Sequence, residues 1–283
     1  MRCVLFYFSG TGNTWWCATT FCRLLTEKGC PSQAVSIEQV TATTTARLVA
    51  TADLVALAWP VYGSDLPQPM KDFMANDLPP NQNSQRRALL FCSQLAFSGD
   101  GAMVAAPELA AKGWEVDWAL HVNMPNNLCI PGSPFPFSND PKHILPYLKR
   151  AKKRLTWLAS MVIIGKPWRQ GAGWFSRGLG LLQRLPYQKA FGKRRDYLAI
   201  DNARCTACGR CWRLCPANNI RPVASSYQLD NKCTFCMRCY NYCPVQAVLF
   251  EGKSHQVRRG APYHGPEKTF QPESLRPETT DIK

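Results

Sequence analysis

The residues with the clearest chemical potential are cysteines, and eight of the chain's 14 lie between Cys205 and Cys243. They form two runs with one spacing, Cys-x2-Cys-x2-Cys-x3-Cys-Pro, which begin at Cys205 and Cys233. Three thiolates separated by two residues let one tight loop reach three corners of an iron–sulfur cube. The fourth cysteine, held apart by three residues and turned away by proline, reaches the other cube. The spacing therefore predicts two 4Fe–4S clusters.

The displaced fourth cysteines decide how the ligands divide between the two clusters. The first cluster is predicted to bind Cys205, Cys208, Cys211 and Cys243, and the second Cys233, Cys236, Cys239 and Cys215. Two zinc sites or a disulfide knot are the alternatives. Zinc sites usually show paired Cys-x-x-Cys hooks, so the duplicated triplets favour the clusters. Because protein occupies every corner of each cube, the arrangement suits single-electron transfer.

The segment from Asp201 to Phe250 resembles the bacterial two-cluster ferredoxins. Ile220 and Val248, a few residues after each Cys-Pro pair, match apolar positions that shield the cubes from water in that family. The resemblance implies a small α+β domain that carries electrons at low potential.

A glycine-rich loop follows the first apolar run, which spans residues 3–8, and opens a helix. Backbone N–H groups of such a loop point into one concavity, and the helix dipole adds positive potential. The loop has no lysine and no GxGxxG pattern, so neither phosphoryl transfer nor dinucleotide binding fits it. It predicts a phosphate cradle, with a plain strand–helix turn as the alternative. Its residues are Ser9, Gly10, Thr11, Gly12, Asn13 and Thr14.

Two further segments follow apolar runs that are expected to be strands. The first consists of Trp59, Pro60, Val61, Tyr62 and Gly63, and the second runs from Ser93 to Gly101. Open α/β sheets bind ligands at the carboxyl ends of their strands, so both segments are expected beside the phosphate site. Trp59 and Tyr62 are candidates to stack on a flat ring, with core aromatics at a strand end as the alternative.

The elements that must position these loops alternate between strands and helices over residues 1–130. This alternation predicts a doubly wound parallel sheet with helices on both faces. The expected strands are residues 3–8, 54–59 and 88–92, and the expected helices are residues 13–28, 68–76 and 102–112. Asp140 and Pro141 then begin a helix whose apolar stripe consists of Ile144, Leu148, Ala151, Leu155, Leu158 and Val162.

Residues 1–165 resemble the flavodoxin-like domain, which binds FMN at such a trio of loops. The resemblance implies that residues 9–14 hold the FMN phosphate. It also implies that residues 59–63 flank one side of the isoalloxazine, and that Ser93, Phe97, Ser98 and Gly99 flank the other. The combination with a dicluster ferredoxin resembles a bacterial family of flavodoxin–ferredoxin fusion proteins. Unlike typical flavodoxins, which are acidic, this chain is strongly basic.

The positive charge is concentrated in one stretch. The chain carries 34 Lys and Arg against 19 Asp and Glu, a net charge of +15. Residues 142–195 hold 14 of the basic residues and no acidic one. Each cluster contributes about −2 and an FMN phosphate about −2, which leaves about +9 unexplained. The sequence predicts four parts: an FMN domain (1–165), a basic amphipathic linker (166–195), a ferredoxin domain (196–251) and a disordered tail (252–283).

This basic belt has four interpretations. A solvated helix face is the plainest, followed by docking of an acidic redox partner protein and by contact with anionic lipid through residues 168–195. Nucleic acid is not expected, because no recognition motif accompanies the charge. The sequence leaves the oligomeric state open.

The other six cysteines and the four histidines form no motif, and no catalytic residue is predicted. Cys92 alone lies beside a predicted flavin loop. The apolar runs are too short to span a bilayer and no signal peptide is evident, so a cytoplasmic location is expected. We expect an electron carrier that links FMN to two 4Fe–4S clusters. The alternatives are a flavin-dependent reductase of a small molecule fed by the clusters, and an adaptor that docks through the basic belt.

Overall fold

A computed structural model describes residues 1–128, 139–194, 197–223, 226–254 and 262–276. The chain divides into two compact units, and each is described by itself. Unit 1 comprises residues 1–9, 13–124 and 147–187, and unit 2 comprises residues 10–12, 125–146 and 188–283. Within the described residues, no helix is both long enough and apolar enough to cross a membrane.

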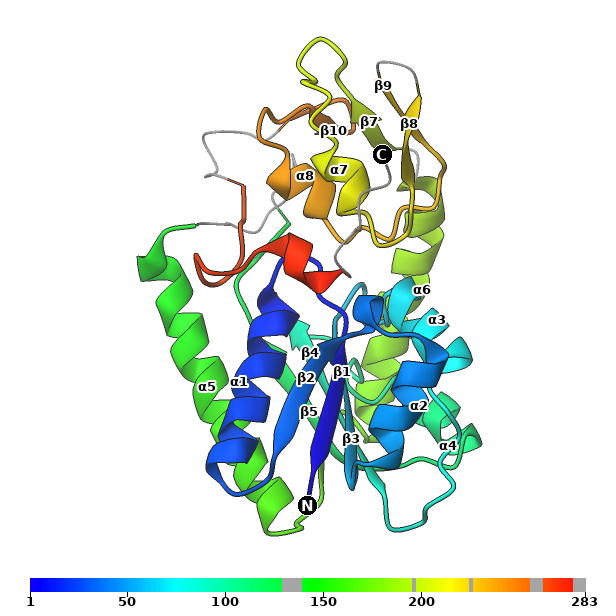
Figure 1. The fold of residues 1–283 in the computed structure, drawn as a ribbon, viewed down its shortest axis with the longest axis vertical. Coiled ribbons are helices and arrows are strands. Elements are labelled where there is room, and N and C mark those ends of the chain that lie inside the picture. Colours follow the sequence, from blue (N-terminus) through cyan, green and yellow to red (C-terminus); the bar gives the residue numbers. More distant parts are fainter. Residues whose placement is uncertain (129–138, 195–196, 224–225, 255–261, 277–283) are drawn as a thin grey trace. The chain divides into compact units, whose positions relative to one another are not determined.

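Unit 1 is built on a six-stranded parallel sheet with the order β2-β1-β3-β4-β5-β6 (Figure 1). The first five strands have the flavodoxin order 2-1-3-4-5, so the predicted α/β class is confirmed. The strands are β1 (Cys3–Tyr7), β2 (Ser32–Ser36), β3 (Leu54–Pro60), β4 (Arg87–Gln94), β5 (Glu115–Asn123) and β6 (Trp168–Arg169).

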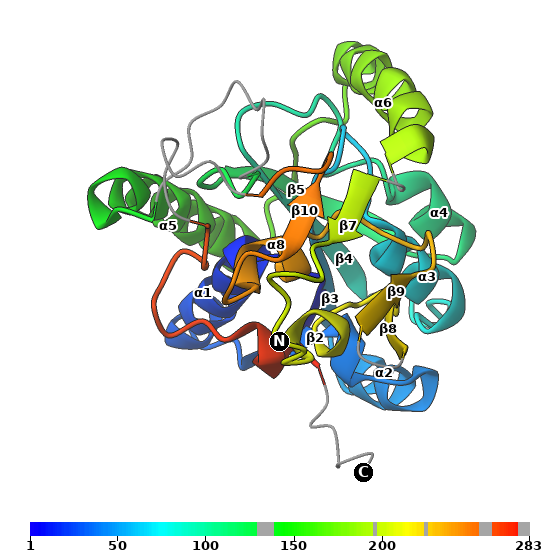
Figure 2. The same ribbon diagram turned by 90° about the horizontal axis from the view of Figure 1, so that it is seen from above.

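Helices cover both faces of this sheet. The helices are α1 (Asn13–Glu27), α2 (Ala42–Ala50), α3 (Gln68–Asn76), α4 (Ala106–Ala111), α5 (Pro141–Ile163) and α6 (Trp174–Arg194), with a short 3-10 helix η1 (Ile37–Gln39). Seen from above, α1 and α5 lie on one face and α2, α3 and α4 on the other (Figure 2). The central strands β1 and β3 are almost wholly buried, which is why they read as continuous apolar runs.

The helix predicted to begin at Asp140 is α5. Its predicted stripe is buried at every position, from Leu148 at 9% exposure to Leu155 and Leu158 at 0%. The Asp140 carboxylate accepts the backbone N–H of Lys142 at 2.9 Å, which satisfies one of the free donors of the first turn.

The predicted linker at residues 166–195 differs from the structure. Part of it pairs with the sheet, because β6 continues the parallel ladder beside Trp118 and Ala119 of β5. The Trp118 indole N–H also donates to the Lys166 carbonyl at 2.9 Å. The rest forms α6, which belongs to unit 1 as far as Tyr187. The sequence analysis predicted the amphipathic character of this segment but neither its strand nor its long helix.

Unit 2 holds two copies of one small motif, offset by 28 residues. One antiparallel ribbon pairs the two outer strands, β7 and β10, and a second pairs the two inner strands, β8 and β9. The elements are β7 (Leu198–Ile200), α7 (Arg210–Arg213), β8 (Ile220–Val223), β9 (Ser226–Leu229), α8 (Arg238–Tyr242), β10 (Val248–Phe250) and the 3-10 helix η4 (Pro272–Leu275). Ile220 and Val248 begin equivalent strands and are 4% and 2% exposed, as predicted for shielding residues.

The predicted disordered tail is corrected for residues 262–276. Tyr263, Phe270 and Leu275 are buried there, and Arg276 donates to the carbonyls of Arg213 and Cys215 at 2.8 Å each. Four prolines and a polar composition suggested disorder, but three well-spaced apolar anchors suffice to fix the segment on unit 2.

Candidate functional site

The two cysteine runs have the same backbone conformation. Left-handed residues recur at equivalent places before the second and third cysteines and after the fourth; they are Ala207 and Phe235, Gly209 and Met237, and Asn218 and Gln246. Left-handed φ values are uncommon for residues other than glycine, so their repetition marks a constrained loop. Each loop wraps its cysteines inward in the same way, as the shared spacing requires.

Backbone donors point at the sulfurs in both copies. The N–H of Asn219 lies 3.2 Å from Cys215 Sγ, and that of Ala247 lies 3.2 Å from Cys243 Sγ. Cys233 Sγ accepts the Phe235 N–H at 3.4 Å. Such N–H···S bonds stabilise thiolate ligands and tune the potential of an iron–sulfur cluster.

The thiols of each predicted ligand set influence one another electrostatically. Burial raises the pKa of Cys211 to about 11, and among its neighbours Cys243, Cys205 and Cys208 also raise it.

The other set behaves in the same way. The pKa of Cys239 is raised by burial and then by Cys236, Cys233 and Cys215, with Cys211 contributing less. The division into two crossed sets, each with its fourth cysteine from the other run, stays a prediction. An iron cluster would bind these groups as thiolates and supply the positive charge that burial otherwise denies them.

A cavity in unit 2 suits the second cluster. Its walls carry all four thiols of that set, Cys215, Cys233, Cys236 and Cys239. The remaining walls are largely apolar and include Leu198, Ile220, Phe235, Met237 and Tyr240. Four sulfur ligands around a sheltered apolar space are what a 4Fe–4S cube needs, so the residues fit the group. Among the described residues, no three His, Cys, Asp or Glu side chains are grouped around a single metal ion.

Two arginines at equivalent positions of the repeat support these loops, and the sequence analysis missed both. Arg210 pairs with Glu273 at 2.8 Å and lies 5.4 Å from the centre of the Tyr242 ring. Arg238 is fully buried, and its guanidinium donates to the carbonyls of Gly10 at 3.0 Å and Leu214 at 3.2 Å. Their shared place one residue before the third cysteine was the available signal.

The candidate phosphate loop joins β1 to α1. Ser9 and Thr14 are each 1% exposed; Ser9 Oγ accepts the Trp15 N–H at 3.2 Å, and the Thr14 and Ser93 hydroxyls lie 2.8 Å apart. The first turn of α1 contains no acidic residue. Buried hydroxyls at the start of a 15-residue helix fit a phosphate dianion. Thr11, in unit 2, accepts a hydrogen bond from the Asn127 amide at 2.8 Å.

The segment after β3 is only partly placed to meet a flat ring. Trp59 is fully buried, and its indole N–H donates to the Gly101 carbonyl at 3.2 Å, so this ring belongs to the core. Tyr62 is half-buried. The Val61 N–H donates to the Ser93 carbonyl at 2.9 Å, which ties this segment to the end of β4.

The segment after β4 turns sharply. Ser98 is fully buried and its hydroxyl donates to Gln94, whereas Phe97 is 55% exposed. Gly99 has a φ of +56°. Of the aromatic residues predicted to flank the isoalloxazine, Tyr62 and Phe97 therefore have free surface and Trp59 does not.

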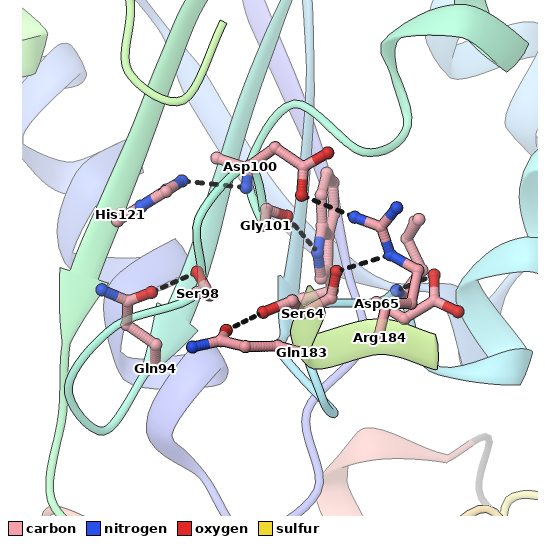
Figure 3. A network of polar contacts seen from close by, with 12 residues as sticks. Ser64, Asp65, Gln94, Ser98, Asp100, Gly101, His121, Gln183 and Arg184 are labelled. Atoms are coloured by element: carbon pink, nitrogen blue, oxygen red, sulfur yellow. Dashed lines mark hydrogen bonds and ion pairs between the residues drawn. The ribbon is translucent and has the colours of Figure 1, made fainter. Parts of the chain in front are cut away.

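Helix α6 holds these two segments together, a role that the sequence did not indicate. Arg184 donates to the Ser64 carbonyl at 3.0 Å and pairs with Asp100 at 2.5 Å, while the Ser64 hydroxyl bonds to Gln183 (Figure 3). A side chain at Gly99 would strike the backbone of Gly180, so the loop and the helix touch directly. Burial raises the pKa of Asp100, and the charge of Arg184 opposes that rise.

His121 lies beside this network in the neutral form (Figure 3). Its Nε2 accepts the Ala102 N–H at 3.0 Å, which fixes the tautomer. Burial lowers the pKa of His121 to about 4, and the positive charge of Arg154 acts in the same direction.

We expect this histidine to make stability fall with acid. The unfolded chain takes up the proton near pH 6.5 and the folded chain only near pH 4, so its contribution is full above pH 6.5 and lost as the pH falls toward 4. The loss is at most about 3 kcal/mol in the free energy of unfolding. Urea unfolding of the full chain, followed by tryptophan fluorescence, measures it. His121→Gln keeps a hydrogen-bond acceptor but does not titrate, so the free energy of unfolding of this variant should depend less on pH between 6.5 and 4. If the original chain and the variant lose stability equally as the pH falls, His121 is not the cause.

The scattered cysteines that the structure describes are Cys3, Cys17, Cys22, Cys30 and Cys92, and all are buried and free of disulfides. Burial raises the pKa of Cys92 far above its ordinary value, so this thiol stays protonated. Cys129 lies outside the described residues.

Comparison with known proteins identifies the cysteine-rich part. Residues 204–248 match the family model of the 4Fe–4S dicluster domain. This match and the strand order of unit 1 show a chain that joins a flavodoxin-like domain to an iron–sulfur domain. A dicluster domain supports a role in electron transfer.

Solved structures similar to the chain cover its sheet domain. A flavodoxin from the domain Archaea aligns with 58% of this chain and 99% of its own at 18% identity, with a TM-score of 0.40. Megasphaera elsdenii flavodoxin aligns with 56% of this chain and 99% of its own at 23% identity, with a TM-score of 0.39. Rubredoxin oxygen:oxidoreductase from Desulfovibrio gigas aligns at 14% identity and 0.42 over 58% of this chain, which spans only 36% of that protein. No curated protein sequence matches the chain.

Proposed function

We propose that this protein is an electron carrier that passes electrons between an FMN held by the sheet domain and two 4Fe–4S clusters held by the cysteine domain. The observation that carries the proposal is the cavity in unit 2, whose walls carry Cys233, Cys236 and Cys239 of one run together with Cys215 of the other. When bound, FMN exchanges one or two electrons and each cluster exchanges one.

The residues of the chain supply binding and shelter in this proposal. Ser9 and Thr14, with the N-terminus of α1, would hold the phosphate, and the segments after β3 and β4 would hold the ring. The cysteine sets would anchor the clusters, and the buried side chains of Ile220 and Val248 would exclude water from them. Joining both sites in one chain raises the effective concentration of one centre near the other. The buried free thiols suit a reducing compartment, which favours the cytoplasm.

Cofactor content tests the proposal directly. Protein purified without oxygen should contain about eight iron and eight acid-labile sulfide per chain, as two such clusters require. It should also contain one FMN, identified by its absorption and by chromatography of the released flavin. Colourless protein that contains zinc in place of iron would overturn the proposal.

Electron passage needs a second measurement on the same preparation. Chemical reduction of the holoprotein, followed by rapid mixing with a one-electron acceptor, should reoxidise flavin and clusters together in absorption and EPR spectra. A partner-free turnover of a small-molecule substrate by the flavin would instead identify a self-contained reductase.

A further inference from the structure

Helix α6 is amphipathic, but its polar side faces unit 1 and its apolar side faces solvent. The side that faces unit 1 is mostly polar or small, and its contacts come from Ser176, Gly180, Gln183 and Arg184, with one aromatic ring, Tyr187, which packs against Gly63. These residues recur at intervals of three and four, so they share one face of the helix. Globular proteins usually turn the apolar face of a helix inward.

The opposite face of α6 is apolar and open to solvent. Trp174 is 85% exposed, and the other members are Phe175, Leu181, Leu182 and Leu185, at 62%, 48%, 70% and 62%. Their spacing places them within one arc of the helix. We call this set the α6 apolar face. Scattered exposed leucines need no explanation, but five large side chains on one helix face indicate a surface that binds something.

Charge limits what can cover this face. Arg177 and Lys189 are exposed on the same helix, and no acidic residue occurs anywhere in residues 142–195. A second copy of the chain would bring the same positive charges together, which opposes self-association through this face. The occupant must therefore offer both negative charge and an apolar interior.

We propose that the α6 apolar face binds the surface of an anionic lipid membrane. Trp, Phe and Leu on one side of a helix and only Arg and Lys among its charges are the pattern of helices that lie in a bilayer interface. The apolar side chains would enter the boundary between headgroups and acyl chains while the basic side chains meet lipid phosphates. An acidic protein matches the charge but does not require five exposed apolar side chains in one arc.

The inward contacts of α6 explain why the helix can present this face without unfolding. The Arg184–Asp100 pair and the close approach of Gly99 to Gly180 hold it against unit 1 from its polar side. The apolar face is therefore offered by a fixed helix, and membrane contact demands no structural rearrangement. Figures 1 and 2 show α6 and α5 on opposite flanks of the sheet, so exposed residues of α5 serve as controls.

Vesicle binding of the holoprotein tests the proposal. We expect flotation with vesicles of phosphatidylcholine and phosphatidylglycerol, little binding to phosphatidylcholine alone, and a blue shift of tryptophan emission. Combined Trp174→Ser, Leu182→Ser and Leu185→Ser substitutions should lower the partition coefficient at least about tenfold. Ile164→Ser, which alters a 64% exposed residue immediately after α5, should leave it unchanged.

A charge series gives an independent arm. Arg177→Glu with Lys189→Glu should weaken binding to anionic vesicles, and Lys28→Glu with Arg47→Glu, which changes the net charge equally, should weaken it much less. Cofactor content and tryptophan fluorescence of the unbound variants verify that they fold.

Three results would overturn the proposal. The first is that the holoprotein fails to bind anionic vesicles, and the second is that the Ser variant and its control bind equally. The third is that the original chain sediments as a dimer and only the Ser variant sediments as a monomer. The first would leave an acidic protein as the occupant, and the third a second copy.

Discussion

Replacing Cys215 with alanine will remove the same cluster as replacing Cys239, although the two residues belong to different runs. The thiol of Cys215 raises the pKa of Cys239 after burial, Cys236 and Cys233, and it lines one cavity with these three cysteines. Each single change should lower the iron content from about eight to about four per chain, because a 4Fe–4S cube requires all four ligands.

Double variants decide the connectivity without assigning any spectrum. The pair Cys215→Ala with Cys239→Ala should retain about four iron, because both changes affect one cluster. The pair Cys215→Ala with Cys211→Ala should retain none, because the two belong to different sets. Cys22→Ala, a buried thiol outside the runs, should keep the full iron content. Uncrossed ligation would exchange the results of the two double variants.

Strong local patterns allowed much of this architecture to be predicted. Helix α3 occupies the predicted residues 68–76, and the buried strands β1, β3 and β4 lie within two residues of their predicted bounds. Continuous burial produces continuous apolar runs, which the sequence displays without reference to the rest of the chain. The cysteine spacing is similarly self-contained, because three ligands come from one loop.

Elements that depend on distant partners were missed or misjudged. Strand β2 reads Ser-Gln-Ala-Val-Ser because it lies at the sheet edge and is half-buried, and α2 begins with three threonines after Ala42. Neither composition favours its structure, so packing against neighbours decides it. Trp59 matched the pattern of a ring-stacking residue, but its distance from the surface is a property of the assembled sheet.

The role of α6 has the same origin. Arg184 contacts Asp100 and Ser64, which lie more than 80 positions away in the sequence. The residues next to Arg184 in the sequence do not indicate either partner. Polar residues on a helix normally predict its solvent face. Here two of them satisfy buried groups of unit 1, which only the folded structure shows.

Removing the two buried hydroxyls of the glycine-rich loop will weaken FMN binding by at least about 100-fold, since each hydrogen bond to a charged acceptor contributes about 1.5–3 kcal/mol. Combined Ser9→Ala and Thr14→Val substitutions delete these donors at the start of α1 with almost no change of volume. The clusters should be untouched, because no cysteine of either set lies near these residues in sequence.

Fluorescence titration of flavin-depleted protein with FMN measures the effect, and riboflavin, which lacks the phosphate, separates its cause. Affinity for riboflavin should be the same in the original chain and the variant, because only the phosphate contacts have been removed. Thr45→Val is the matched control: its hydroxyl is buried on α2 and makes no hydrogen bond with any described residue, so FMN affinity should not change. An equal loss for riboflavin would show that the substitutions distort the ring site, and unchanged FMN affinity would place the phosphate elsewhere.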